Sequence, residues 1–96
     1  MEVKASTVRA TVKVYVQGVG FRVFVRSAAW RLHLKGFVRN MPDGTLQVVA
    51  SGPRQSLEKL LSEVWRGPAG AQVHSVDTQW EEGEAAGVGQ TFEVRL

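Results

Sequence analysis

The stretch VRATVKVYVQGVGFRVFVRSAAWRL, residues 8–32, decides the fold, because its hydrophobic period changes from that of a strand to that of a helix. Over residues 8–16 every second side chain is apolar, the pattern of a half-buried strand. Gly18 and Gly20 interrupt this pattern, and from residue 21 to residue 32 the apolar residues recur at helical spacing. We therefore predict a strand that leads through a tight turn directly into a helix.

The remaining segments are assigned by the same rules. The spacing predicts a second strand over 35–40, a turn at Met41-Pro42-Asp43-Gly44 and a third strand over 45–51, which together form a hairpin. We place Pro53 as the first residue of a second helix that ends at Gly67-Pro68. The apolar stripe of this helix consists of Leu57, Leu60, Leu61, Val64 and Trp65. A fourth strand over 73–80, a loop over 81–90 and a short strand over 92–96 complete the chain.

The predicted order of elements indicates an α+β fold of the ferredoxin-like class, βαββαβ with an additional short C-terminal strand. In this class two helices cover one face of an antiparallel sheet. We expect one domain over residues 1–96, with residues 1 to about 6 as a short N-terminal extension. We also expect His33 to close the first helix in the left-handed conformation. Because this fold carries many unrelated functions, function has to be argued from a site.

Composition excludes several classes of protein. The chain has no cysteine, so disulfides, thiolate nucleophiles and Cys-ligated metals are absent, and His33 and His74 cannot form a zinc site alone. No apolar run reaches the roughly 18 residues that a membrane-spanning helix needs, and the N-terminus does not resemble a signal peptide. We therefore expect a cytoplasmic protein that binds no membrane.

The charges are distributed unevenly along the chain. Residues 1–40 carry a net charge of +7, whereas residues 41–96 carry −4. This asymmetry suggests that an anion is attracted to the N-terminal half. From charge alone, however, solvated side chains on exposed faces are the more common explanation.

The segment Gln17-Gly18-Val19-Gly20-Phe21-Arg22 is the candidate binding site for that anion. The first N–H groups of a helix have no acceptor within it, and the helix dipole places partial positive charge beside them. Glycines allow successive N–H groups to converge on an anion, and the Arg22 guanidinium can grip two phosphate oxygens. A tight turn with no ligand is the alternative. The segment matches neither a Walker loop nor a dinucleotide-binding fingerprint.

Two motifs carry a resemblance to a known family. VQGVGFR at residues 16–22 and GFVRNMPDGTLQVVASG at residues 36–52 resemble the acylphosphatases over nearly the whole chain. The resemblance implies hydrolysis of acyl phosphates to carboxylate and inorganic phosphate, without metal or cofactor, by a monomer. It also implies that Arg22 binds the substrate and that Asn40 positions the attacking water. From spacing alone, Asn40 is more commonly a turn-forming or strand-ending residue.

The sequence departs from the family pattern at three positions. Val14 and Tyr15 stand where a glycine and a polar or basic residue are usual, so the family pattern does not determine the shape of the pocket here. Tyr15 is a candidate for lining the approach to this pocket. His33 replaces a glycine after the first helix, which we expect to lower stability rather than activity. Arg39 alternates with Asn40 and is therefore expected on the opposite face of the sheet.

Two other function classes fit parts of the pattern. A nucleic-acid-binding module is compatible with the fold and with the basic N-terminal half, but the predicted strand over 45–51 holds no aromatic residue for base stacking. We therefore expect no nucleic acid among the partners. A regulatory domain that binds acyl or carbamoyl phosphate is the other alternative, and turnover of acyl phosphates separates an enzyme from such a sensor.

Overall fold

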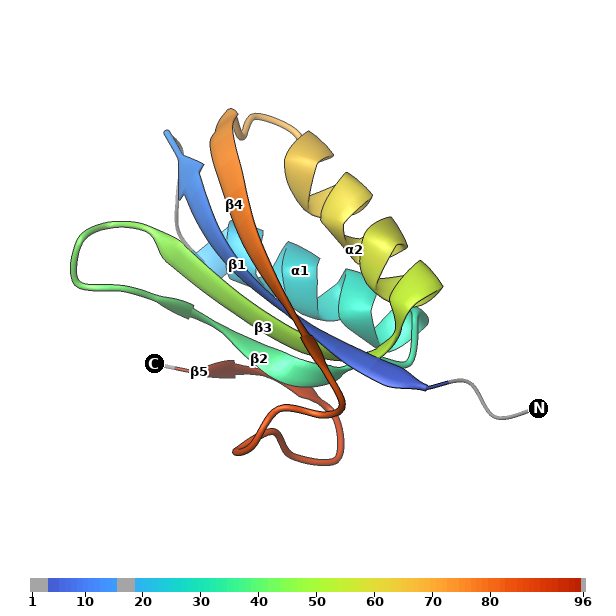
Figure 1. The fold of residues 1–96 in the computed structure, drawn as a ribbon. Helices are drawn as coiled ribbons and strands as arrows, with labels where there is room; N and C mark the ends of the chain where they lie inside the picture. Colours follow the sequence, from blue (N-terminus) through green and yellow to red (C-terminus); the bar gives the residue numbers. More distant parts are fainter. Residues whose placement is uncertain (1–3, 16–18, 96) are drawn as a thin grey trace.

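The computed structural model of this chain describes residues 4–15 and 19–95. Within these residues the elements are β1 (Ala5–Val14), α1 (Val19–Arg31), β2 (Lys35–Asn40), β3 (Leu46–Pro53), α2 (Arg54–Arg66), β4 (Val73–Glu82) and β5 (Phe92–Arg95). The strands form one sheet in the order β4-β1-β3-β2-β5, and both helices cover the same face of it (Figure 1). This confirms the ferredoxin-like α+β fold.

The sheet is mixed, which corrects the prediction of an antiparallel one. The pairs β1–β3, β1–β4 and β2–β3 are antiparallel, but β5 lies parallel to β2, with Gly36 opposite Phe92. The reason is topological. β4 ends at the end of the sheet where β2 begins, and the connection over 83–91 carries the chain across to the other edge, so β5 must run in the direction of β2.

Several element boundaries differ from the prediction. β1 begins at Ala5, because Ala5 and Ser6 already pair with Pro53 and Gly52 of β3 instead of belonging to an N-terminal extension. Pro53 was predicted to start the second helix, but with φ −61° and ψ 138° it is extended and ends β3. A ψ of this size is incompatible with helix, so α2 starts at Arg54.

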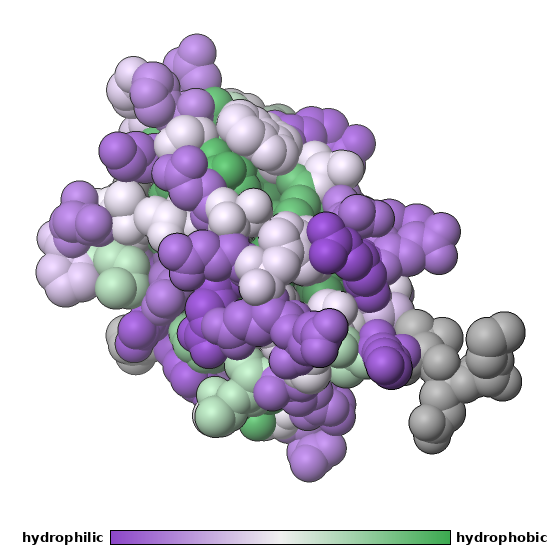
Figure 2. All heavy atoms as spheres, in the orientation of Figure 1, coloured by the Kyte–Doolittle hydropathy of each residue, from purple (hydrophilic) through white to green (hydrophobic). Residues whose placement is uncertain are grey.

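The main core lies between the sheet and the two helices. Alternate residues of β1, β3 and β2 face the helices and are buried, and α2 contributes the predicted stripe positions Leu57, Leu60 and Val64. The fully buried strand residues of this layer include Val8, Val12, Val38, Leu46 and Val48. Hydrophilic side chains dominate the outer surface in the view of Figure 2. None of the helices in residues 4–15 and 19–95 is long and apolar enough to cross a membrane.

The connection over 83–91 corresponds to the loop predicted over 81–90, and it covers part of the other face of the sheet. Ala85 is buried there against Phe37 and Val49. A chain of hydrogen bonds fixes this connection: Ala85 N–H donates to Ser51 Oγ (3.1 Å), and Thr7 Oγ1 donates to Gly83 O (2.7 Å). Since the Thr7 proton is used in this way, the 2.7 Å bond between the two hydroxyls must have Ser51 as its donor.

The end of α1 confirms the expectation for His33. This residue has φ 57°, the only positive φ of a non-glycine residue in the part of the chain that the structure describes. Its N–H donates to Trp30 O (3.1 Å), and the N–H of Leu34 donates to Ala29 O (2.9 Å), as at helix ends closed by a left-handed residue.

Candidate active site

The site is built on the N-terminus of α1. The helix begins at Val19, two residues before the predicted start, so Val19 and Gly20 lie in its first turn. Of the predicted phosphate-binding segment, Gln17 and Gly18 lie outside the described residues. Gly20 does not have a positive φ, and a Cβ built on it would meet no atom within 4 Å. The glycine therefore leaves open space over the helix N-terminus rather than providing an unusual backbone conformation.

Arg22 follows one turn into this helix, and no group in the described residues neutralises it. The first turn of α1 contains no acidic residue, and in the described part of the chain Arg22 forms no ion pair and no hydrogen bond. Its Nε is nevertheless buried, so this donor is removed from water without a partner. A buried unpartnered donor is costly unless a ligand supplies the acceptor. Arg22 thus carries a charge and a buried donor that no described group of the protein satisfies.

Asn40 lies at the same end of the sheet as the start of α1. It is the last residue of β2, and the register places it opposite Leu46, which in turn lies opposite Val12 near the end of β1. Because α1 begins shortly after β1 ends, the ends of β1 and β2 and the first turn of α1 meet on one side of the molecule, the left side in Figure 1. The sheet topology therefore brings two segments that are distant in sequence to one place.

Strand alternation also places Asn40 on the helix-covered face. Val38, two residues before it, is fully buried under the helices, and side chains at i and i+2 share a face. Arg39 has the opposite orientation, as predicted: its Nε donates to Gln47 Oε1 at 2.9 Å on the other face. Asn40 is exposed, and within residues 4–15 and 19–95 its amide has no hydrogen-bond partner.

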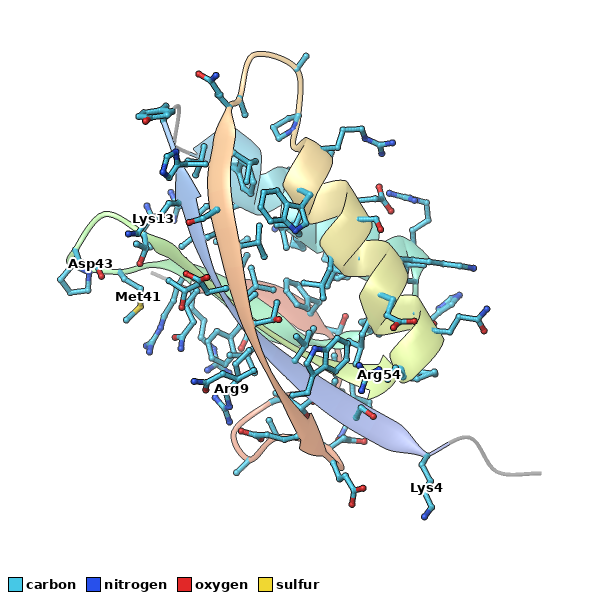
Figure 3. All side chains as sticks on the ribbon, turned by 45° about the horizontal axis from the view of Figure 1, so that its top comes forward. Lys4, Arg9, Lys13, Met41, Asp43 and Arg54 are labelled. Atoms are coloured by element: carbon cyan, nitrogen blue, oxygen red, sulfur yellow. The ribbon has the colours of Figure 1, made fainter. Side chains whose placement is uncertain are left out.

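The turn after Asn40 is held by Asp43, which leaves the Asn40 amide available. Asp43 Oδ1 accepts hydrogen bonds from the hydroxyl (2.6 Å) and the N–H (3.0 Å) of Thr45, and these bonds lower the pKa of the Asp43 carboxyl. The Lys13 ammonium also lowers this pKa, and Figure 3 shows Lys13 on β1 next to the turn that carries Met41 and Asp43. Asp43 therefore performs the turn-forming role that spacing alone would assign to Asn40.

The two departures at the end of β1 have different consequences. Val14 is buried in the main core, next to a bulge between Lys13 and Val14, so its bulk points into the protein interior. Tyr15 is 70% exposed and its ring meets the ring of His74 edge to face, with centroids 5.5 Å apart. The structure thus places an exposed aromatic pair at the end of β1.

Three of the eight basic residues in the N-terminal half pair with acidic residues from the C-terminal half. Arg9 pairs with Glu81 (2.8 Å), Lys35 with Glu84 (3.3 Å) and Arg31 with Glu63 (2.8 Å). The opposite net charges of the two halves are thus used in ion pairs that join separate elements of the fold. Arg22 is among the cations that remain without a carboxylate in the described structure.

Arg26 is a residue of interest that the sequence analysis counted only as a charge. It lies one turn after Arg22, its Nε is likewise buried without a partner, and its guanidinium carbon lies 4.7 Å from the centroid of the Trp30 ring. The i, i+4 spacing of Arg22, Arg26 and Trp30 in the sequence is the signal that could have revealed this row.

The fold is that of an α+β protein whose α1 N-terminus has no acidic residue in its first turn. The acylphosphatase family model matches residues 8–94. An acylphosphatase from Thermus thermophilus is 47% identical over 79 residues, which cover 82% of this chain and 88% of the relative. The crystal structure of an acylphosphatase from Bacillus subtilis has a TM-score of 0.86 at 30% identity and covers 95% of this chain and 99% of its own. This chain therefore belongs to the acylphosphatase family and is an enzyme of that family.

A further structural match concerns a larger protein. Full-length HypF, solved in a phosphate- and nucleotide-bound form, has a TM-score of 0.79 at 26% identity. The match covers 97% of this chain but only 12% of HypF. The same fold therefore also occurs as a small part of a much longer chain.

Proposed function

We propose that this chain hydrolyses acyl phosphates, with the transferred phosphoryl group held at the N-terminus of α1 by backbone N–H groups and Arg22. The observation that supports the proposal is that Arg22 and Asn40, whose polar groups have no protein partner in the described structure, come from elements that share one end and one face of the sheet. The segment from Gln17 to Phe21 would supply the backbone N–H groups.

Asn40 would orient the attacking water. Its amide cannot take a proton at neutral pH, but its carbonyl can accept a hydrogen bond from water while its N–H donates to a phosphoryl oxygen. The water oxygen forms a bond to phosphorus as the bond between phosphorus and the acyl oxygen breaks. The electron pair of that bond leaves with the carboxylate, and the water proton ends on phosphate. A carboxylate is a good leaving group, so positioning and electrostatic stabilisation of the phosphoryl oxygens suffice.

The open face of the sheet supports this choice over nucleic-acid binding. Where the structure describes them, the residues of β1 and β3 on that face include Thr7, Arg9, Gln47 and Ser51 and no aromatic side chain. Arg9 is already paired with Glu81. In the described residues, β1 and β3 therefore offer no aromatic stacking platform on this face. The monomeric state and the cytoplasmic location stay predictions from the sequence.

The test is hydrolysis of benzoyl phosphate in the presence of EDTA by the wild type and by folded Arg22→Ala, Asn40→Ala and Arg39→Ala proteins. We expect Arg22→Ala and Asn40→Ala each to lower the rate by at least about 10²-fold. Arg39→Ala is the matched control, because Arg39 is the neighbour of Asn40 but lies on the other face. Inhibition by inorganic phosphate separates the two roles: Arg22→Ala should weaken it, whereas Asn40→Ala should mainly lower kcat.

Two results would contradict the proposal. If folded Arg22→Ala and Asn40→Ala retain turnover within a few-fold of the wild type, the residues do not have these roles. If the folded wild type binds phosphate but does not turn over benzoyl phosphate, the chain is a sensor of phosphorylated ligands rather than a hydrolase.

A further inference from the structure

One face of α1 carries a row of two arginines and a tryptophan. Arg22, Arg26 and Trp30 are spaced four residues apart and therefore lie above one another along the helix. The Nε atoms of the two arginines are the only buried side-chain nitrogen or oxygen atoms without a hydrogen-bond partner in the part of the chain that the structure describes. The unsatisfied donors of the protein are thus concentrated in this one row.

The position of Arg26 is fixed by the tryptophan below it. The guanidinium of Arg26 stacks over the Trp30 ring, at 4.7 Å from the centroid. The indole Nε1–H of Trp30 donates to Phe92 O at 2.7 Å, which ties the ring to β5. The tryptophan is about half exposed, but its ring is held by the hydrogen bond to Phe92 O on one side and by the stacked guanidinium of Arg26 on the other. The side chain of Arg26 is therefore preorganised rather than free in solvent.

The row is electrostatically unfavourable without a ligand. Like charges at i, i+4 on a helix repel each other, and the helix N-terminus adds positive charge beside Arg22. Neither Arg22 nor Arg26 has a carboxylate partner in residues 4–15 and 19–95, whereas Arg31 at the other end of the same helix makes two hydrogen bonds to Glu63 (2.8 and 3.1 Å). The row accordingly has the character of a site for two negative groups, one at each arginine.

We propose that Arg26 binds a second negative group on the acyl part of the substrate, so that the enzyme favours acyl phosphates whose acyl group itself carries a carboxylate or phosphate. This inference rests on the proposed function, in which Arg22 holds the phosphoryl group. Four residues of helix correspond to about 6 Å of rise, and the placement of the Arg26 guanidinium over Trp30 adds to this span. A substrate with its second anion a few bonds from the acyl carbon fits that separation.

The experiment compares benzoyl phosphate with 3-carboxybenzoyl phosphate, which adds one carboxylate to the same ring. The quantity measured is the ratio of kcat/KM for the carboxylated substrate to kcat/KM for benzoyl phosphate. We expect the wild type to favour the carboxylated substrate and Arg26→Gln to lower the ratio by about tenfold, the effect of one lost charge-assisted hydrogen bond. Arg26→Lys should keep most of the preference, because it keeps the charge.

Arg31→Gln is the matched control, since it removes the same charge from the same helix at a position five residues, or about 7.5 Å along the axis, beyond Arg26. It should leave the ratio unchanged. The inference is overturned if Arg26→Gln leaves the ratio at the wild-type value, or if Arg31→Gln lowers it equally, which would indicate a general effect of net charge. In both cases turnover of benzoyl phosphate by the wild type would still support the proposed function. If the wild type does not turn over benzoyl phosphate, the proposed function itself is wrong.

Discussion

Gly36 tests how closely β2 must approach β3, the pairing that holds Asn40 in its position at the end of β2. Gly36 has φ 141°, a backbone conformation that residues with a side chain rarely adopt. A Cβ at this position would overlap the carbonyl oxygen of Val49 and lie 2.8 Å from its carbonyl carbon. Because the obstacle is backbone rather than a flexible side chain, Gly36→Ala can be accommodated only if β2 moves away from β3.

The size of the effect follows from two terms. The strained φ costs on the order of 1–3 kcal/mol, and forcing extra volume into a packed contact costs a further ~1–3 kcal/mol. Alanine reduces the entropy of the unfolded chain, which offsets about 0.4–1 kcal/mol. We therefore expect Gly36→Ala to lower the free energy of unfolding by about 3 kcal/mol. This is a large part of the roughly 5–14 kcal/mol that a domain of this length has.

Gly44→Ala is the matched control. Gly44 has φ 89°, but a Cβ built there meets no atom within 4 Å, so only the conformational strain applies. We expect this variant to lose about 1 kcal/mol. In urea unfolding followed by tryptophan fluorescence, the difference between the two variants corresponds to a separation of their midpoints by about 1 M. Equal midpoints for the two variants would refute the argument that the contact with Val49 matters.

Two further predictions concern stability. The Glu63 carboxyl has a lowered pKa, mainly because Arg31 donates hydrogen bonds to it, so its contribution to stability is complete above the ordinary carboxyl pKa and is lost as the pH falls through the lowered value. In urea unfolding, acidification from about pH 7 to about pH 3 should therefore destabilise the wild type more than Glu63→Gln, and parallel losses would contradict this. Thr7→Val removes the donor to Gly83 O and leaves the buried Ser51 hydroxyl without its acceptor, so it should lower the free energy of unfolding by about 2 kcal/mol. Thr7→Ser retains the hydroxyl and should lower it less. An equal loss in both variants would argue against the hydrogen-bond chain.

The parts of the fold that depend on local pattern could be predicted from the sequence. The stripe at Leu57, Leu60 and Val64 identifies a helix because burial of one face requires that spacing. The alternation in β1 identifies a half-buried strand for the same kind of reason, and the structure confirms which of its residues face the helices. His33 could be assigned to the left-handed position because few residue types tolerate it after a helix.

What could not be predicted depends on contacts between distant segments. Nothing in the residues over 83–91 indicates that Ala85 is buried against Phe37, because that burial exists only once β4 and β5 occupy opposite edges of the sheet. The start of α2 shows the same limit: proline suits both the first position of a helix and the last residue of a strand, and the extended ψ of Pro53 decides between them.

The candidate site depends both on local sequence pattern and on contacts between distant segments, and it is most sensitive to the register of β2. Because side chains alternate along a strand, a shift of β2 by one residue would turn Asn40 away from α1 and put Arg39 in its place. Two contacts oppose such a shift: Gly36 is the residue that allows the close approach to Val49, and Phe37 is buried under Ala85 on the other face. The residues that hold Asn40 in position therefore lie at the opposite end of β2, and a substitution there should impair the chemistry without touching the substrate.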